Sequence, residues 1–278
     1  LGAPRAGTSV LGRILEAHPS VRHVKEPRLI WRYRNDWRSD LMPASAVTPA
    51  IAKYIRDKFS RLYDDSGSKR LLEKTPSNSL RVPFIEKIFP GAIYVHIIRN
   101  GFDSAASIRS YWEGATSGIA NGRIGDNETI IRQRLREAAP SQIPYYLYEL
   151  VGRIMPRSGS QPNALWGPRL PGLRAMTRDL DLIEVAALQW RYCVELAALD
   201  GRQLGPNKYM ELRLENLTLE SIQEVLRHVD LEESSAVESY FLRHFNPSQH
   251  QSREASLSEG EREKVGRFIT PTMEWLKY

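Results

Sequence analysis

The sequence predicts an α/β protein in which a mainly parallel sheet is flanked by helices and carries a mostly helical insertion. Short β-branched and aromatic runs alternate with helical stretches, a pattern typical of parallel sheets covered on both faces. A glycine-rich turn, GAPRAGTS, directly precedes the first helical stretch. The 278 residues show no internal repeat, so we expect a single domain, with residues 113–181 as the insertion.

Each element follows from local composition. Helices are expected where apolar residues recur every three or four positions or where a capping box opens a stretch: residues 8–17, 46–62, 76–89, 102–112, 182–204, 218–229 and a last helix after Ser258 and Glu261. Strands are expected at residues 70–73, 92–98 and 208–212, and Leu1 has the place of a strand end. Between residues 113 and 181, Gly, Pro, Arg and Tyr cluster and only short helices are expected.

Composition narrows the class of protein. Hydrophobic residues make up 41% and charged residues 26%, which is ordinary for a soluble globular chain, and the net charge of +6 mildly favours anionic ligands. The single cysteine, Cys193, excludes an intramolecular disulfide framework and suits a reducing compartment. No apolar run has the length of a membrane span, and no signal peptide is visible. We therefore expect a cytoplasmic protein without a membrane or nucleic-acid partner.

The glycine-rich turn has the outline of a phosphate-binding loop. Gly2 and Gly7 allow a tight turn, while backbone N–H groups and the hydroxyls of Thr8 and Ser9 can converge on an anion at a helix start. Thr8 stands where a loop that hydrolyses nucleoside triphosphates carries its lysine, and Arg5 supplies positive charge instead. A simple turn with a helix cap is the alternative interpretation.

Three longer stretches resemble the sulfotransferases that use 3'-phosphoadenosine 5'-phosphosulfate (PAPS). GAPRAGTSVLGRILEAHPSVRHVKEPR is similar to the opening of that family and is closest in spacing to its tyrosylprotein sulfotransferase branch. HIIRNGFDSAASIRS resembles the second signature of the family, and LLEKTPSN resembles its Lys-[Asp/Thr]-Pro segment. The resemblance implies a P-loop-like fold and sulfuryl transfer from PAPS, which leaves adenosine 3',5'-bisphosphate (PAP).

The resemblance also implies roles for individual residues. Glu26 is placed as the general base, with Arg28 beside it at the acceptor, and Lys74 and Arg5 as catalytic cations. Arg99 and Ser107 are placed at the 3'-phosphate. The loop that would hold the 5'-phosphosulfate consists of Arg5, Ala6, Gly7, Thr8 and Ser9.

Charge and geometry agree with these roles. A donor with two anionic ends needs two anion sites, and the loop and Arg99 both follow expected parallel strands, whose carboxyl ends share one edge of a sheet. Arginine offers bidentate donors to phosphate. The histidines show no metal-ligand spacing and the scheme requires no metal, so no metal is expected.

Some positions depart from the family pattern. Tyr111 stands where the resembled branch often has an arginine, with Arg109 as a candidate substitute, and Leu214 stands where an aromatic residue is common. The Gly-rich closing segment of the small-molecule branch is not found, and Ser252 or Arg253 is the candidate replacement. The part of the site that holds adenosine is therefore the least defined.

The sequence thus favours a PAPS-dependent sulfotransferase acting on a hydroxyl or amine of a small-molecule acceptor, such as a natural product. Residues 113–181 are expected to serve as a lid and acceptor-binding insertion, and the chain allows for a homodimer. One alternative is a small-molecule kinase that uses Mg-ATP, which a magnesium requirement would reveal. A second alternative is a non-catalytic anion-binding or scaffold protein, which would bind ligand without turnover.

Overall fold

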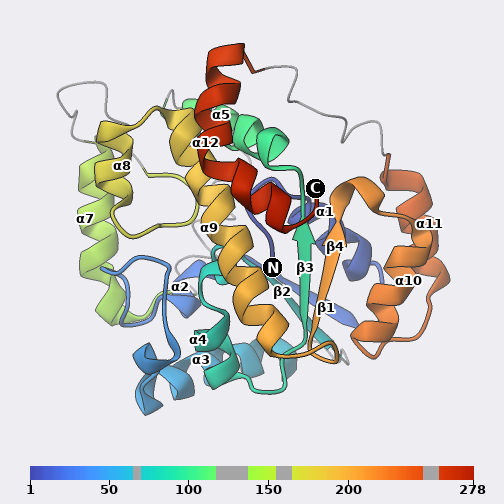
Figure 1. Cartoon of the computed structure of the whole chain (residues 1–278). Coiled ribbons are helices and arrows are strands. Elements are labelled where there is room, and N and C mark those ends of the chain that lie inside the picture. Colours follow the sequence, from blue (N-terminus) through green and yellow to red (C-terminus); the bar gives the residue numbers. More distant parts are fainter. Residues whose placement is uncertain (65–69, 117–136, 155–164, 247–256) are drawn as a thin grey trace.

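The computed structural model describes residues 1–64, 70–116, 137–154, 165–246 and 257–278 (Figure 1). Two parallel strand pairs lie at its centre: β1 (Val21–Lys25) with β2 (Arg70–Lys74), and β3 (Tyr94–Ile98) with β4 (Tyr209–Arg213). Leu1 continues the ladder of β3 on the edge away from β4, because its backbone nitrogen donates to Val95 O at 2.6 Å and its carbonyl accepts from Ile97 N at 3.1 Å. Leu1 therefore has the strand-like pairing that the sequence predicts.

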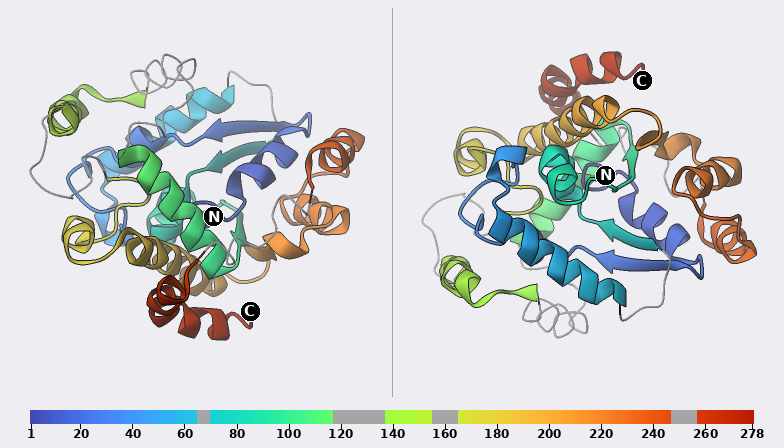
Figure 2. Two further views of the ribbon diagram at one scale, coloured as in Figure 1. Left: turned by 90° about the horizontal axis from the view of Figure 1, so that it is seen from above. Right: turned by 90° about the horizontal axis from the view of Figure 1, so that it is seen from below.

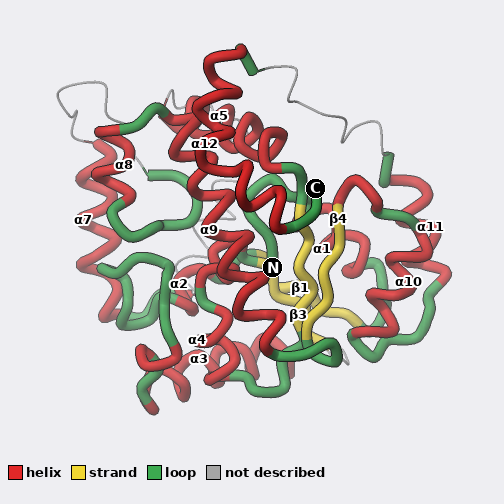
Figure 3. Tube along the Cα trace, viewed as in Figure 1, coloured by secondary structure: helices red, strands yellow, loops and turns green. Residues whose placement is uncertain are grey.

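Helices surround these strands (Figures 2 and 3). They are α1 (Thr8–Glu16), α2 (Arg28–Trp31), α3 (Pro49–Asp64), α4 (Val82–Ile88), α5 (Gly101–Thr116), α7 (Ile143–Ile154), α8 (Leu173–Asp179), α9 (Leu182–Gln203), α10 (Leu219–His228), α11 (Ser235–His244) and α12 (Glu259–Trp275). Short 3-10 turns occupy Ala44–Ala46, Pro76–Leu80, Pro140–Gln142 and Leu214–Asn216. The predicted α/β class is confirmed.

Three groups of buried apolar side chains hold the elements together. One joins α5, α9 and α12 around Trp112 and Trp190. Another packs α1 against α10, α11 and the end of β4, and a further group joins α2, α3 and α4 below the strands. Gly101 permits the close approach of α9 and α12 to the start of α5, since a Cβ there would lie 2.8 Å from Ile269 and 3.0 Å from the Trp190 ring.

The structure departs from the predicted elements at a few places. The expected helix over residues 76–89 is divided into the turn Pro76–Leu80 and α4, because Pro83 favours the first turn of a helix rather than its interior. Strand β1 was not predicted, since VRHVK is short and only partly buried. Within residues 113–181, the described parts are helical or irregular and contain no strand. Ser252 and Arg253 lie outside the described residues, and the lid assignment stays a prediction.

Candidate active site

The glycine-rich loop lies close to the ends of β3 and β4. Its glycines permit the backbone conformation and the close packing found there. Gly7 has a φ of 92° and lies against Leu214, whose Cδ1 would be 2.7 Å from a Cβ at that position. A side chain on Gly2 would collide with Ile97 O at 2.7 Å. Gly7 is the N-cap residue of α1, so the N–H groups of Thr8 and Ser9 have no acceptor within that helix, whereas those of Val10 and Leu11 donate to the Gly7 carbonyl at 2.9 and 3.0 Å. This arrangement is suited to an anion.

Leu214 has a packing role at the position where the family pattern favours an aromatic residue. Its side chain is 1% exposed and fills the space beneath Gly7. It cannot offer a ring face to a ligand, unlike the aromatic residue that is common at this position in the resembled family.

Arg5, Arg99 and Ser107 come together next to the loop. Arg5 Nε donates to Ser107 Oγ at 3.0 Å, and Arg99 Nη1 donates to the Arg5 carbonyl at 3.4 Å. The Arg99 side chain is buried beside Asp103, with 3.8 Å between their charged groups, and its Nε has no hydrogen-bond acceptor among the described residues. A buried guanidinium N–H without an acceptor is a donor that an anionic ligand could satisfy.

The guanidinium group of Arg5 packs over an aromatic ring. Its guanidinium carbon lies 4.3 Å from the centroid of Tyr111, and the Tyr111 ring in turn lies 5.4 Å from that of Trp166. Tyr111, which replaces the arginine of the resembled branch, therefore holds a cation rather than an anion. Arg109, the candidate substitute, pairs with Glu261 and lies 3.5 Å from Glu113, and its role in place of that arginine stays a prediction.

Glu26, Lys74 and Arg28 form a second charged group at the ends of β1 and β2. The backbone nitrogen of Glu26 donates to Lys74 O at 3.0 Å, which extends the strand ladder by one residue. Lys74 Nζ donates to Glu26 Oε1 at 2.6 Å, and Arg28 Nη2 donates to Glu26 Oε2. Glu26 has a φ of 50°, in the left-handed region that non-glycine residues seldom adopt. The strained backbone thus presents the carboxylate to both cations.

The cations determine the ionisation of Glu26. Burial acts to raise the pKa of its carboxyl, but the charges of Arg28 and Lys74 and their hydrogen bonds outweigh this and lower the pKa below 4.5. The carboxylate is therefore ionised at neutral pH and can accept a proton. Its basicity is weakened for as long as both cations remain in place.

Glu73 is a further polar residue of this region that the sequence did not reveal. Its carboxylate is buried and accepts hydrogen bonds from Thr75 Oγ1 at 2.5 Å, Asn78 Nδ2 at 2.6 Å and Trp31 Nε1 at 3.1 Å. Burial raises its pKa despite these bonds. Because its partners come from α2 and from the turn after β2, Glu73 fixes the strand end that carries Lys74. The position of this glutamate directly after Leu71 and Leu72 in the predicted strand is the sequence signal that could have found it.

The loop and the two charged groups belong to one edge of the molecule. Each follows the carboxyl end of a strand, and Gly2 N donates to Ser79 Oγ at 2.9 Å, which ties the loop to the turn after Lys74. The predicted site residues therefore lie on both sides of the loop. Arg99 and Ser107 are on the β3 side, and Glu26 and Lys74 are on the β2 side.

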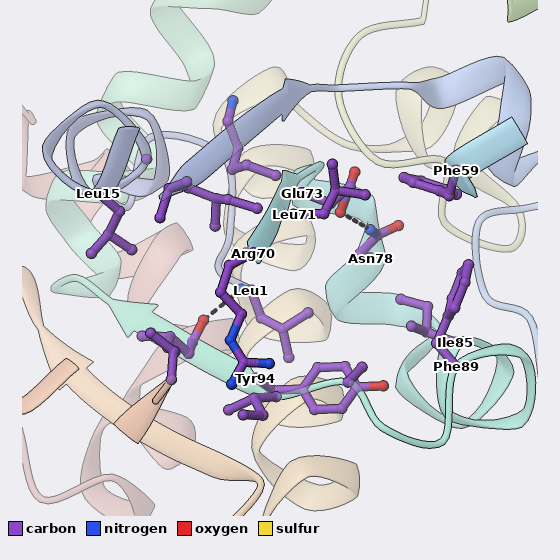
Figure 4. A pocket seen from close by; sticks show the side chains of 18 of the residues that line it. Leu1, Leu15, Phe59, Arg70, Leu71, Glu73, Asn78, Ile85, Phe89 and Tyr94 are labelled. Atoms are coloured by element: carbon purple, nitrogen blue, oxygen red, sulfur yellow. Dashed lines mark hydrogen bonds between the residues drawn. The ribbon is translucent and has the colours of Figure 1, made fainter. Parts of the chain in front are cut away.

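A cavity of about 720 Å³ lies between the facing edges of β2 and β3 (Figure 4). Its walls are mainly apolar, with Leu15, Leu71, Ile85 and Phe89 among the side chains drawn there. Of the predicted site residues, Thr8 and Lys74 border it. The cavity therefore reaches the start of α1 and the end of β2, but most of the predicted site residues do not line it.

Across the described ranges, no group of three or more His, Cys, Asp and Glu side chains is arranged to hold a metal ion. None of the helices in that same part of the chain combines the length and apolar character needed to cross a membrane.

Comparisons with known proteins agree with this geometry. Residues 1–142 match the model of the sulfotransferase family. The nodulation protein NoeE of Sinorhizobium fredii is 28% identical over 128 residues, which cover 40% of this chain and 30% of that protein. Protein-tyrosine sulfotransferase A of Caenorhabditis elegans is 30% identical over 120 residues, 39% of this chain and 32% of that protein. The matched segment thus spans well under half the length of these relatives.

Solved structures extend the similarity to the whole fold. The sulfotransferase STF9 from Mycobacterium avium superposes with a TM-score of 0.53 at 12% identity, over 99% of this chain and 75% of that one. The sulfotransferase domain from the curacin biosynthetic pathway gives a TM-score of 0.52 at 12% identity, over 98% and 95% of the two chains. With a family model that matches half of its length and a shared fold, the chain belongs to the sulfotransferase family.

Proposed function

We propose that this sulfotransferase transfers the sulfuryl group of PAPS to a hydroxyl or amine of a small-molecule acceptor, with Glu26 as general base. The observation that carries the proposal is the Lys74–Glu26 ion pair at the strand ends next to the anion loop. It places a cation and a base side by side, where an activated sulfuryl group and an acceptor would meet. No metal ion is required for this scheme.

Two sides of the site would hold the two anionic ends of the donor. The loop residues Gly7, Thr8 and Ser9 at the start of α1 would hold the 5'-phosphosulfate, and Arg99 with Ser107 would hold the 3'-phosphate. Arg5 lies between them and is already bonded to Ser107. The buried Arg99 Nε, which has no acceptor within the described ranges, supports an anionic ligand on that side.

The proposed reaction is an in-line displacement at sulfur. The acceptor oxygen or nitrogen forms a bond to sulfur while the bond from sulfur to the 5'-phosphate oxygen breaks, and PAP leaves with the bonding electron pair. Glu26 takes the acceptor proton, and Lys74 and Arg5 neutralise charge on the sulfonate and leaving oxygens. By analogy with phosphoryl transfer, positioning and charge stabilisation account for most of the catalysis.

Lys74 has a second effect in this scheme, through its contact with the base. In the structure its ammonium group is bonded to Glu26 and lowers the pKa of that carboxyl. If Lys74 turns toward the anionic donor, Glu26 loses one counter-charge and becomes a stronger base. Proton removal would then be most effective in the donor-bound enzyme.

The nature of the acceptor is the broadest part of the proposal. Arg28, bonded to Glu26, would orient it beside the base, and residues 113–181 would close over it. A small acceptor such as a natural product, in the cytoplasm, agrees with the single, buried Cys193. A homodimer remains a prediction from the sequence.

A kinase that uses Mg-ATP is disfavoured by Thr8, which occupies the position of the phosphate-loop lysine. A non-catalytic anion-binding protein would not need a strained glutamate between two cations. Each alternative predicts a ligand-binding result that differs from that of a sulfotransferase.

Calorimetric titration of the wild type and Arg99→Ala with PAP, and with ADP or ATP plus Mg²⁺, separates these functions. The proposal predicts metal-independent binding of PAP that is lost in Arg99→Ala, followed by turnover of labelled PAPS with an acceptor library. Preferred binding of ATP with Mg²⁺ would instead identify a kinase. Tight binding of PAP without turnover across the acceptor library would favour the scaffold.

A further inference from the structure

The last residues of the chain lie against the ends of β3 and β4. Arg213 is the final residue of β4 and is in register with Ile98, the residue before Arg99. Its Nη2 donates to the carbonyls of Leu276 at 2.6 Å and Lys277 at 2.9 Å, just after α12. Its guanidinium carbon also lies 4.4 Å from the centroid of the Tyr278 ring. Arg213 therefore anchors the segment after α12 to the strand ends. In Figure 1 the label C lies close to the ends of β3 and β4.

Glu215 connects this anchor to the turn after Arg99. Its Oε2 accepts a hydrogen bond from Tyr278 OH at 3.0 Å, and its Oε1 accepts one from the backbone nitrogen of Asn100 at 2.8 Å. Asn100 in turn opens α5, since its Oδ1 accepts from the backbone nitrogens of Phe102 at 2.9 Å and Asp103 at 3.3 Å. One carboxylate thus joins the end of the chain to the helix that carries Ser107.

The backbone of Arg99 is fixed from the opposite side as well. Trp190 Nε1, on α9, donates to the Arg99 carbonyl at 3.0 Å. Gly101 N lies 3.3 Å from the Met273 sulfur, and α12 packs closely over this glycine. The turn from Arg99 to Gly101 is consequently held by α9, α12 and Glu215 together.

We propose that Arg213, Glu215 and Tyr278 form a clamp that positions Arg99 and the start of α5 for the 3'-phosphate of the donor. This inference rests on the proposed assignment of Arg99 and Ser107 to that phosphate. The residues of the clamp are positioning residues, which act through the Arg99 turn. A preset guanidinium loses less conformational freedom on binding, so loosening the clamp weakens 3'-phosphate binding selectively.

A positioning role predicts weaker binding only of ligands that carry the 3'-phosphate. A general loss of stability would weaken the binding of both ligands. Calorimetry compares PAP with adenosine 5'-phosphosulfate, which lacks the 3'-phosphate, for the wild type, Tyr278→Phe, Glu215→Ala and Glu215→Gln. Loss of the clamp in Tyr278→Phe and Glu215→Ala is expected to raise the Kd for PAP about five- to tenfold, with the Kd for adenosine 5'-phosphosulfate unchanged. Glu215→Gln keeps an oxygen that can accept from Asn100 N and is expected to recover most of the affinity.

Tyr94→Phe is the matched control, because it removes a Tyr–Glu hydrogen bond, to Glu86 Oε2 at 3.2 Å, from the opposite end of β3. It is expected to leave the ratio of the two Kd values unchanged. Equal weakening of both ligands by the clamp variants, or no weakening of PAP, would overturn the positioning role while leaving the proposed function intact. If the wild type fails to bind PAP, the proposed function itself is wrong and this inference with it.

Discussion

Lys74 Nζ lies 2.6 Å from Glu26 Oε1, at the point where the parallel strands β1 and β2 end together. The pairing register makes this contact possible, because Lys25 and Lys74 are opposite one another and Glu26 is the next residue along the chain. The two side chains that the sequence assigned separately to catalysis are therefore joined in one ion pair. A substitution at either residue should therefore change the charge environment of the other.

Replacing Lys74 should shift the pH dependence of the reaction. In Lys74→Met, Glu26 loses a cation that lowers its pKa, while the burial that raises it remains, so its pKa rises. A higher pKa leaves less carboxylate at a given acidic pH, and the acidic limb of the kcat/KM profile for PAPS, which reports the free enzyme, moves to higher pH. Sulfuryl transfer from labelled PAPS, measured across about pH 4 to 8, would show this shift together with a loss of kcat of about 10²–10³-fold.

Lys25→Met provides the comparison. Lys25 lies on the neighbouring strand β1 and pairs with Glu16 of α1 at 2.9 Å. Its pH profile should match that of the wild type. An acidic limb in Lys74→Met that stays in place or moves to lower pH would exclude Lys74 as a determinant of the basicity of Glu26.

Glu26→Gln should separate chemistry from donor binding. The amide cannot take the acceptor proton, so kcat is expected to fall about 10²–10⁴-fold. The residues assigned to the donor phosphates lie on the loop, directly after β3 and on α5, so the Kd for PAP should stay within about twofold of the wild type. Parallel rate and calorimetric measurements test both parts, with Glu16→Gln as a control on α1. Turnover near the wild-type rate in Glu26→Gln would rule out the general-base role.

Much of the fold was predictable because its strands are marked locally. The segments that became β2, β3 and β4 each contain neighbouring apolar residues, and β3 is rich in β-branched and aromatic residues. The short strand β1 was missed, since its alternating polar residues are only partly buried and its pairing with β2 depends on a distant segment. Pairing partners of this kind are not encoded in local periodicity.

The site was predictable by residue type and position but not by contact. Motif spacing singled out Glu26, Lys74 and Arg99, yet nothing in it shows that Lys74 bonds to Glu26. The contact of Arg213 with Tyr278 joins segments far apart in the sequence and appears only once α12 is docked. Side-chain direction depends on strand order and packing, which the sequence specifies only through the whole fold.

His96 should make the protein less stable in mild acid. Its side chain is buried on β3 with Nδ1 at 2.6 Å from Tyr209 OH, and burial lowers its pKa well below the ordinary 6.5. The folded protein keeps the ring neutral, whereas the unfolded chain binds a proton below about pH 6.5, so protonation favours unfolding. Stability contributed by His96 is present above that pH and falls by up to about 1.4 kcal/mol per pH unit below it.

Thermal unfolding of the wild type and His96→Gln at several pH values between about 5 and 8 measures this contribution. The variant should have a shallower loss of Tm on acidification, whatever its absolute stability at neutral pH. His244→Gln, at an exposed histidine at the end of α11, should keep the wild-type slope. Identical slopes in the wild type and His96→Gln would show that His96 does not govern acid stability.

Tyr111 should influence the donor site through Arg5. The tyrosine ring lies 4.3 Å from the guanidinium carbon and holds the arginine near Ser107, so removing the ring frees Arg5 to adopt other rotamers. Tyr111→Leu is expected to lower kcat/KM for PAPS about two- to fivefold, the range of a partly exposed cation–π contact. Tyr111→Phe keeps the ring and should retain the wild-type value. Equal losses in Tyr111→Leu and Tyr111→Phe would assign the effect to the hydroxyl and contradict support of Arg5 by the ring.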